Sequence, residues 1–126
     1  MEKQSGGIQI RHREETRAQI QRAAERVFAD YGFVGASFSR IAAEAGLPKS
    51  NIVYYYQTKE KLYRNVVENI FNVWREAADV LSPERDPINA LGDYIETKLD
   101  LARTRPYGSK VWANEVIQRA PVVQDY

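Results

Sequence analysis

The stretch Gly46–Leu62 reads G-L-P-K-S-N-I-V-Y-Y-Y-Q-T-K-E-K-L, and the interpretation of the whole chain starts from it. Gly46 favours the left-handed conformation that ends a helix, and Pro48 suits the first position of the next helix. The pattern therefore predicts two helices joined by a turn of about three residues, as in a helix-turn-helix motif. The second of these helices is predicted to break near Gln57.

Two lysines occupy unusual positions around this stretch. Lys49 and Lys59 both fall in the first turn of a predicted helix, where the positive end of the helix dipole makes a cation unfavourable by about 0.3 to 1 kcal/mol. Helix-terminal N–H groups and a lysine together favour a phosphate group. Two local exceptions this close together therefore indicate a surface that meets an anion.

Composition limits the class of protein. The chain has 126 residues and a hydrophobic fraction of 44%, enough to bury a core. It has no cysteine and one histidine, so we expect no disulfide, no metal site and no cofactor. No apolar run approaches about 18 residues and no signal-peptide pattern opens the chain, which predicts a cytoplasmic protein without a membrane partner.

The net charge of +1 conceals a division along the chain. Residues 1–65 contain eleven Lys and Arg against seven Asp and Glu, a balance of +4, whereas residues 66–126 contain seven against ten, a balance of −3. A basic excess confined to one module is typical of proteins that bind nucleic acids. The N-terminal half is therefore the expected nucleic-acid-binding part.

Before the motif we expect a mobile basic arm, residues 1–14, and a helix over residues 15–31. Arg11 and Arg13 could reach DNA phosphates or the minor groove, or simply belong to a frayed terminus. Thr16 and Gln19 have the spacing of a capping box, and Gly32 supplies the stop. The predicted buried face of this helix comprises Ile20, Ala23, Ala24, Val27, Phe28 and Tyr31.

Ser37 is placed to cap the next helix, whose apolar face is Phe38, Ile41, Ala42 and Ala45. After the motif, three further helices are predicted. The first runs over residues 58–81, with Thr58 as its cap. The second runs over 86–105 with Asp86 as its cap, and the third over 108–119. The predicted buried residues of the second are Ile88, Leu91, Tyr94, Ile95, Leu99 and Ala102.

The residues of this region resemble the N-terminal signature of the TetR family of bacterial transcriptional regulators. The resemblance covers residues 15–65 and is carried by Ser37, Ile41-Ala42, Ala45-Gly46, Tyr55, Thr58-Lys59-Glu60 and Leu62. It implies an all-α protein with a three-helix DNA-binding domain over 15–65. It also implies that residues 66–126 are the first helices of a ligand-binding and dimerisation domain.

The resemblance also implies which residues contact DNA. Those that match the family's DNA-facing positions are Lys49, Ser50, Asn51, Tyr54 and Tyr55, and those that match its phosphate contacts are Ser37 and Lys59. Three positions depart from the family pattern: Pro48 where Ser or Thr is usual, Val53 for a tyrosine, and Tyr56 for a phenylalanine. Tyr54 is the expected substitute for the missing hydroxyl at position 53.

The chemistry of the predicted recognition helix agrees with that assignment. Asn51 offers a donor and an acceptor together, the pairing that reads adenine in the major groove, and Lys49 can reach guanine or a phosphate. Tyr54 and Tyr55 each combine a hydroxyl for phosphate with a ring for a sugar or a thymine methyl group. Tyr56 shares a face with Ile52, so we expect it to close the small core.

Four aromatic residues are candidates to line a ligand pocket: Trp74, Tyr94, Tyr107 and Trp112. Aromatic residues at helical spacing are more often core residues. The N-I-V-Y-Y-Y-Q-T-K run, Trp74 and the Y-I-E-T-K-L segment are similar to the pyrimidine-utilisation regulators within the family, which suggests a nucleobase-like effector. TetR-family chains normally continue through the helices that form the homodimer, so this chain is expected to be truncated and to bind operator DNA poorly alone.

Other classes of protein fit less well. No nucleophile elbow, phosphate-binding glycine loop or metal-spaced His/Cys cluster is present, so we expect no enzymatic activity. The alternative is a helical protein-interaction module without sequence-specific DNA binding. Salt dependence of binding distinguishes a DNA-binding protein from an interaction module, because phosphate binding weakens steeply as salt rises and binding through an apolar interface does not. The resemblance to the TetR family implies a repressor that a small molecule releases from its operator.

Overall fold

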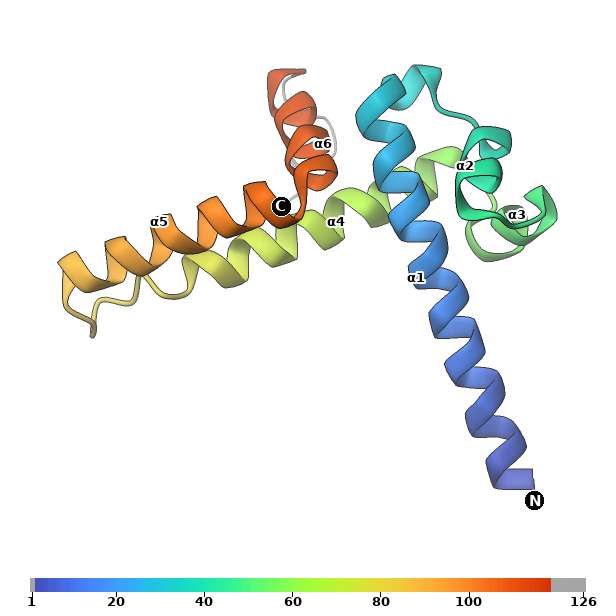
Figure 1. Cartoon of the computed structure of the whole chain (residues 1–126), viewed down its shortest axis with the longest axis horizontal. Coiled ribbons are helices and arrows are strands. Elements are labelled where there is room, and N and C mark those ends of the chain that lie inside the picture. Colours follow the sequence, from blue (N-terminus) through green and yellow to red (C-terminus); the bar gives the residue numbers. More distant parts are fainter. Residues whose placement is uncertain (1, 119–126) are drawn as a thin grey trace. The chain divides into compact units, whose positions relative to one another are not determined.

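The computed structural model describes residues 2–118, with side chains from residue 9 onward, and these residues form six helices and no strand (Figure 1). The chain divides into two compact units, one up to Tyr63 and one from Arg64 onward. The predicted all-α class is confirmed. The helices are α1 (Glu2–Gly35), α2 (Phe38–Ala45), α3 (Lys49–Tyr56), α4 (Lys59–Ala78), α5 (Pro87–Thr104) and α6 (Pro106–Ile117).

Helix α1 is longer than predicted. It begins at Glu2 instead of Glu15, so the segment expected to be an arm is helical over its described residues. Extending an existing helix adds one hydrogen bond for each residue fixed, and here that gain outweighs the cost of about 1 kcal/mol for each glycine in the N-terminal segment. The predicted stop is confirmed, because Gly32 has φ 70° and ψ 178° and interrupts the helix.

The capping box predicted for Thr16 and Gln19 is wrong, because the helix continues through both residues. The Thr16 hydroxyl donates instead to the carbonyl oxygen of His12, one turn earlier, at 2.8 Å. The Gln19 side-chain amide donates to the carbonyl oxygen of Ala45 at 2.5 Å. Gln19 therefore supports the end of α2 and not the start of α1.

The core of the first unit joins α1, α2, α3 and the start of α4. Its fully buried members are Ile20, Ala24, Phe28, Ile41, Ile52 and Leu62. Phe28, Phe33 and Tyr63 form an aromatic cluster, with ring centroids 4.9 Å apart for Phe28–Tyr63 and 5.0 Å apart for Phe33–Tyr63. Tyr31, predicted to be buried, is 51% exposed, and the Arg40 guanidinium lies 4.1 Å from its ring centroid.

The predicted turn between α2 and α3 is confirmed in most details. Ser37 caps α2 by accepting a hydrogen bond from the Arg40 backbone N–H at 3.2 Å. Gly46 ends α2 in the left-handed conformation, with φ 70° and ψ 30°. Pro48 lies one position earlier than predicted, at the N-cap of α3, where it offers no side-chain acceptor.

Helix α4 starts as predicted, with the Thr58 hydroxyl accepting from the Lys61 backbone N–H at 3.2 Å. It ends at Ala78, three residues before the predicted end. Leu81, the last residue of the predicted helix, lies beyond α4 and is exposed. The Asp79 N–H bonds to both Arg75 and Glu76 carbonyl oxygens, a tightening of the last turn that is common where helices end.

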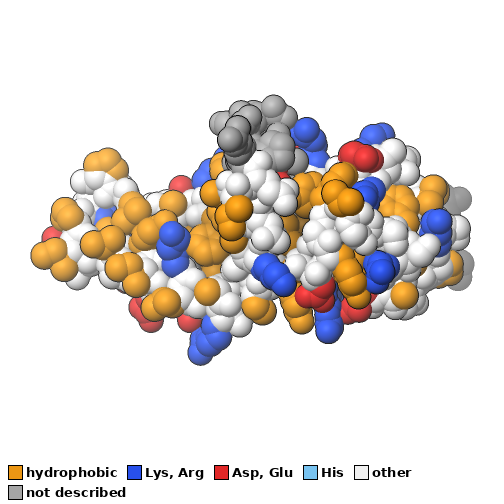
Figure 2. All heavy atoms as spheres, turned by 90° about the horizontal axis from the view of Figure 1, so that it is seen from above, with side chains coloured by type: hydrophobic (Ala, Val, Ile, Leu, Met, Phe, Trp, Pro, Cys, Tyr) orange, Lys and Arg blue, Asp and Glu red, His pale blue; other side chains and the backbone are white. Residues whose placement is uncertain are grey.

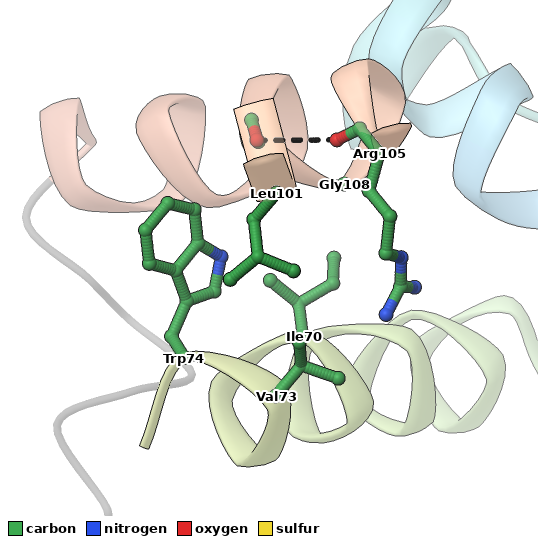
Figure 3. A pocket seen from close by; sticks show the side chains of 7 residues that line it. Ile70, Val73, Trp74, Leu101, Arg105 and Gly108 are labelled. Carbon is green, nitrogen blue, oxygen red and sulfur yellow. Dashed lines mark hydrogen bonds between the residues drawn. The ribbon is translucent and has the colours of Figure 1, made fainter. Parts of the chain in front are cut away.

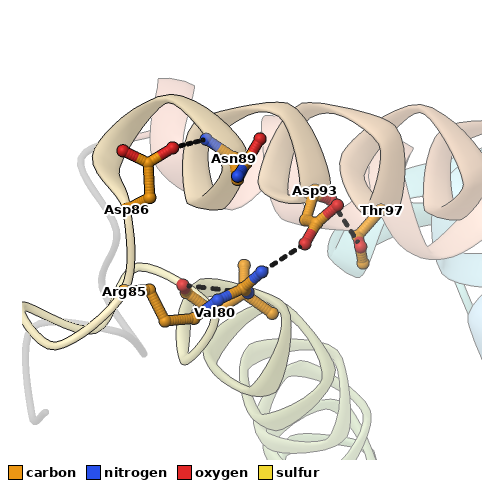
Figure 4. Close-up of polar contacts among 6 residues, drawn as sticks. All are labelled: Val80, Arg85, Asp86, Asn89, Asp93 and Thr97. Atoms are coloured by element: carbon orange, nitrogen blue, oxygen red, sulfur yellow. Dashed lines mark hydrogen bonds and ion pairs between the residues drawn. The ribbon is translucent and has the colours of Figure 1, made fainter.

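A polar network closes the connection between α4 and α5 (Figure 4). The Arg85 guanidinium donates to the Val80 carbonyl oxygen at 3.4 Å and to the Asp93 carboxylate at 2.6 Å. Asp86 caps α5 as predicted, accepting from the Asn89 backbone N–H at 3.3 Å. Arg85 thus links the segment after α4 to the second turn of α5.

The burial predicted for α5 is wrong. Within the described residues, Ala90 is the fully buried member of this helix and Tyr94 is half-buried. The exposed members of the predicted face are Ile88, Leu91, Ile95, Leu99 and Ala102. Figure 2 shows apolar side chains gathered on the surface toward the end where α4 and α5 are connected. An amphipathic pattern reports that a face favours burial but not that a partner covers it.

Helix α6 begins at Pro106, two residues before the predicted start, because proline suits the first turn of a helix. Val111 and Glu115 are buried within it. Its predicted end at Arg119 lies outside the described residues. No helix in the described part of the chain has the length and apolar content needed to span a membrane.

We predict that Ile52→Ala destabilises the first unit by about 2 to 5 kcal/mol, because the fully buried side chain leaves a cavity when it is truncated. Urea unfolding followed by circular dichroism measures this change. Val34→Ala is the control, since Val34 is 90% exposed and its truncation should change stability by less than about 0.5 kcal/mol. Equal effects of the two substitutions would contradict the assigned core.

Candidate nucleic-acid interface

Helix α3 separates a buried face from an exposed one within eight residues. Ile52 is fully buried, and Tyr55 and Tyr56 are half-buried. The side chains of the exposed face are Lys49, Ser50, Val53 and Tyr54. Asn51, predicted to read a base, is half-buried at the edge of that face. The exposed face therefore includes Val53, which sequence reasoning treated as a lost contact.

The C-terminal end of α3 carries the one non-glycine residue with positive φ among the described residues. Gln57 has φ 61° and ψ −54°. Its backbone N–H donates to the Val53 carbonyl oxygen at 2.9 Å, and its side-chain amide donates to the Tyr54 carbonyl oxygen at 2.9 Å. Unfavourable backbone conformations of this kind concentrate at functional sites. These two bonds hold the backbone carbonyl groups of Val53 and Tyr54, two residues of the exposed face.

Helix α1 positions α3 through polar side chains one turn apart. The Gln21 amide nitrogen lies 2.9 Å from the Tyr56 hydroxyl oxygen. The Arg17 guanidinium lies over the ring of Tyr55, 5.6 Å from its centroid. Two consecutive tyrosines at the end of α3 are therefore contacted by one face of α1.

The Gln21–Tyr56 bond explains a departure from the family pattern. A phenylalanine at position 56 has no hydroxyl to accommodate, whereas a partly buried tyrosine hydroxyl requires a partner. Gln21 supplies that partner. Tyr56, predicted to close the small core, is half-buried, and its hydroxyl links the end of α3 to α1.

The two residues predicted to contact phosphate, Ser37 and Lys59, both lie next to Ala36. Lys59 donates through its ammonium to the Ala36 carbonyl oxygen at 3.2 Å, and its nitrogen is 4.4 Å from the Phe33 ring centroid. Ser37 follows Ala36 directly. An ammonium has three donors and a hydroxyl both donates and accepts, so neither group is saturated by the hydrogen bonds described here. The fold thus brings the starts of α2 and α4 to the same loop.

The second unit contains a small cavity lined by Trp74 (Figure 3). Its other lining residues are Ile70, Val73, Leu101, Arg105, Gly108 and Ser109. The Ser109 hydroxyl donates to the Arg105 carbonyl oxygen at 3.1 Å, which leaves mainly apolar groups to line the space. The volume is about 10 Å³, close to the minimum for a single water molecule.

The other three predicted ligand residues are not among those that line this cavity. Tyr94 is half-buried, and the Lys98 ammonium lies 5.0 Å from its ring centroid and 5.5 Å from that of Trp74. Trp112 packs against Phe71, with centroids 5.8 Å apart. Tyr107 is exposed. The structure therefore brings Trp74 and Tyr94 to one lysine, while Trp112 belongs to a separate aromatic contact.

This geometry defines a class of protein. An eight-residue helix follows a glycine turn, exposes lysine, serine and tyrosine side chains, and is fixed from behind by two other helices. That is the arrangement of a helix-turn-helix domain, in which the second helix of the motif enters the major groove.

Comparison with known proteins identifies the family. Residues 20–66 match the model described as "Bacterial regulatory proteins, tetR family", and residues 67–126 match "YcdC-like protein, C-terminal region" of the TetR C-terminal domains. The chain belongs to the TetR family. The family resemblance carried by the motif is confirmed.

The relatives are transcriptional regulators, which agrees with the predicted class of protein. The chain is 33% identical over 106 residues to the HTH-type transcriptional regulator RutR of Escherichia coli, a match covering 84% of this chain and 50% of that protein. It is 31% identical over 96 residues to the HTH-type transcriptional repressor NicS of Pseudomonas putida, covering 75% and 45%. The chain spans about half the length of the curated relatives it matches.

Solved structures show the same fold. A TetR-like transcriptional regulator from Rhodococcus sp. RHA1 superposes with a TM-score of 0.77 at 27% identity, covering 90% of this chain and 62% of that one. The hemolysin II regulator HlyIIR gives a TM-score of 0.76 at 29% identity, covering 90% and 65%.

We predict that the Gln21–Tyr56 bond contributes about 0.5 to 1.5 kcal/mol to the stability of the first unit. Tyr56→Phe should cost that amount in the native chain and nearly nothing in a Gln21→Met background, and urea unfolding of the four proteins measures the difference. Tyr54→Phe is the matched control, because Tyr54 is 68% exposed and should lose no stability. Additive effects of the two substitutions would show that the pair does not hold α3.

Proposed function

We propose that this protein is a ligand-responsive, DNA-binding transcriptional regulator, a repressor that leaves its operator when a small molecule binds. The observation that carries the proposal is the exposed face of α3, which presents polar and cationic groups above a buried isoleucine. An eight-residue helix has little stability of its own, so this surface exists only because α1 and α2 support it. Such support suits a surface that must keep a fixed shape.

Two residues of α3 are proposed to read bases. Lys49 is exposed at the first turn of the helix, where the N-terminal residues of a recognition helix reach base edges. Asn51 is half-buried, which restricts its side chain and favours the bidentate pairing with adenine. Ser50, Tyr54 and Tyr55 are proposed to contact phosphates and sugars.

DNA phosphates beside α3 are proposed to bind where Ser37 and Lys59 lie next to Ala36. Lys59 is already anchored on the Ala36 carbonyl oxygen, which limits the side-chain entropy lost when it binds a phosphate. Arg11 and Arg13 are exposed on the N-terminal part of α1 and are proposed to add further phosphate contacts. Binding through phosphates alone carries no sequence information, so specificity depends on α3.

The protein is proposed to act as a homodimer on double-stranded operator DNA in the cytoplasm. Helix-turn-helix proteins of this kind read two half-sites spaced about 34 to 36 Å apart, which requires two copies of α3. The family assignment supports this arrangement.

Asn51→Ala is expected to relax sequence preference at one base pair, at a cost of about 1 to 3 kcal/mol against the preferred site. Lys49→Ala is expected to reduce preference at a neighbouring base pair. Fluorescence anisotropy on duplexes selected from a random library measures both effects. Asn72→Ala is the control, since Asn72 is an exposed asparagine of α4 outside the proposed interface. Unchanged preference in both α3 variants would place the reading surface elsewhere.

The effector is proposed to bind in the second unit beside Trp74. The resemblance of the sequence to pyrimidine-utilisation regulators suggests a nucleobase-like ligand, and a large aromatic ring beside an apolar cavity is compatible with one. A nucleobase is larger than the space described, so binding requires Trp74 or Leu101 to move. Helix α4 begins at Lys59 and also carries Trp74. It is therefore the proposed link between the effector site and DNA.

Uracil or thymine is expected to raise the melting temperature of the full-length protein. At a ligand concentration of one hundred times the Kd, the free energy of unfolding should rise by about 2.7 kcal/mol. Trp74→Leu should abolish this shift, because it removes the ring on which a planar ligand stacks. Thermal denaturation across a ligand series measures the effect, and Tyr31→Phe in the first unit is the control. A melting temperature that neither compound moves would contradict the proposed ligand class.

A further inference from the structure

We infer that Val53 is a specificity-determining residue that contacts the 5-methyl group of a thymine in the operator. This inference rests on the proposed function, because it requires α3 to enter the major groove. It concerns a residue that the family pattern marks only as a lost hydroxyl.

The first observation is where Val53 lies. It is 43% exposed, between Ser50 and Tyr54 on the surface of α3, and one helical turn after Lys49. Single exposed valines are common on protein surfaces. This one belongs to the same face as a lysine and two hydroxyl side chains, which are the groups expected to meet DNA.

The second observation is that valine is a poor choice for this helix on local grounds. β-Branched residues lose side-chain freedom in helices, and α3 is short, has no side-chain N-cap and carries a lysine in its first turn. Val53 is 43% exposed, so burial within the protein offsets only part of this cost. Because the rest of the protein does not fully offset the low helix propensity of valine, a contact with a binding partner is the suggested compensation.

The third observation is that hydrogen bonds from Gln57 hold the backbone at Val53 and Tyr54. The Gln57 N–H bonds to the Val53 carbonyl oxygen, and the Gln57 side chain bonds to the next carbonyl oxygen, so the backbone here is fixed at both groups. In a helix a valine has essentially one side-chain rotamer. Its methyl groups are therefore preorganised and lose little entropy on contact.

The chemistry of the major groove then selects the partner. A valine side chain has no donor or acceptor, so it cannot distinguish bases by hydrogen bonds. The 5-methyl group of thymine is the apolar group that base-pair edges present in the major groove. Burying one methyl-sized group is worth about a fourfold change in affinity. Val53 is thus suited to favour thymine over cytosine at one position of each half-site.

Replacement of thymine by 2′-deoxyuridine tests this contact, since it removes only the methyl group. The preferred duplex is first selected from a random library with the full-length protein, and its thymines are then replaced one at a time. At one thymine of each half-site the native protein should lose about fourfold in affinity. Val53→Ala should bind the thymine and deoxyuridine duplexes equally at that position.

Val34→Ala is the matched control, a truncation of a valine that is 90% exposed on the segment after Gly32. It should keep the full deoxyuridine penalty. Alanine is the stronger helix former, so Val53→Ala is expected to fold, and circular dichroism checks this. If Val53→Ala keeps the same penalty at every thymine, or if no thymine in the native complex is sensitive, the inference is overturned while DNA binding stands. If selection enriches no sequence, the proposed function itself fails.

Discussion

The geometry of the interface depends on the burial of Ile52. Helix α3 has eight residues and no side-chain cap at its start, so its own hydrogen bonds do not stabilise it sufficiently. Ile52 anchors the middle of the helix in the core, and the Tyr56 hydroxyl fixes its end to Gln21 of α1. One buried side chain and one hydrogen bond therefore orient the exposed face that Ser50, Val53 and Tyr54 present.

The first unit could largely be predicted from the sequence because its signals are local. Ser37, Gly46 and Thr58 each terminate or start a helix through bonds within a few residues, and all three were correctly assigned. The contacts between helices could not be predicted in this way. Gln21 and Tyr56 are 35 residues apart, and neither residue type indicates the other. The same reason explains why Gln19 was assigned to a capping box and not to the end of α2.

The second unit was harder to predict because apolar periodicity does not identify the partner of a face. The α5 pattern was interpreted as burial, yet Ile88, Leu91 and Leu99 are exposed over the described residues. The predicted ligand residues show the same difficulty. An aromatic residue fits equally well against a ligand, against Lys98 as Trp74 and Tyr94 do, or against a second ring as Trp112 does.

Helix α3 is proposed to read the DNA sequence, while Ser37 and Lys59 beside it bind phosphate. Binding of the full-length protein to its selected duplex and to a scrambled duplex, measured by fluorescence anisotropy from low to high salt, tests both parts together. We predict that affinity for both duplexes falls steeply as salt rises, while the preference for the selected sequence persists. Equal binding to the two duplexes, or binding that salt does not weaken, would contradict it and favour an apolar protein-interaction surface.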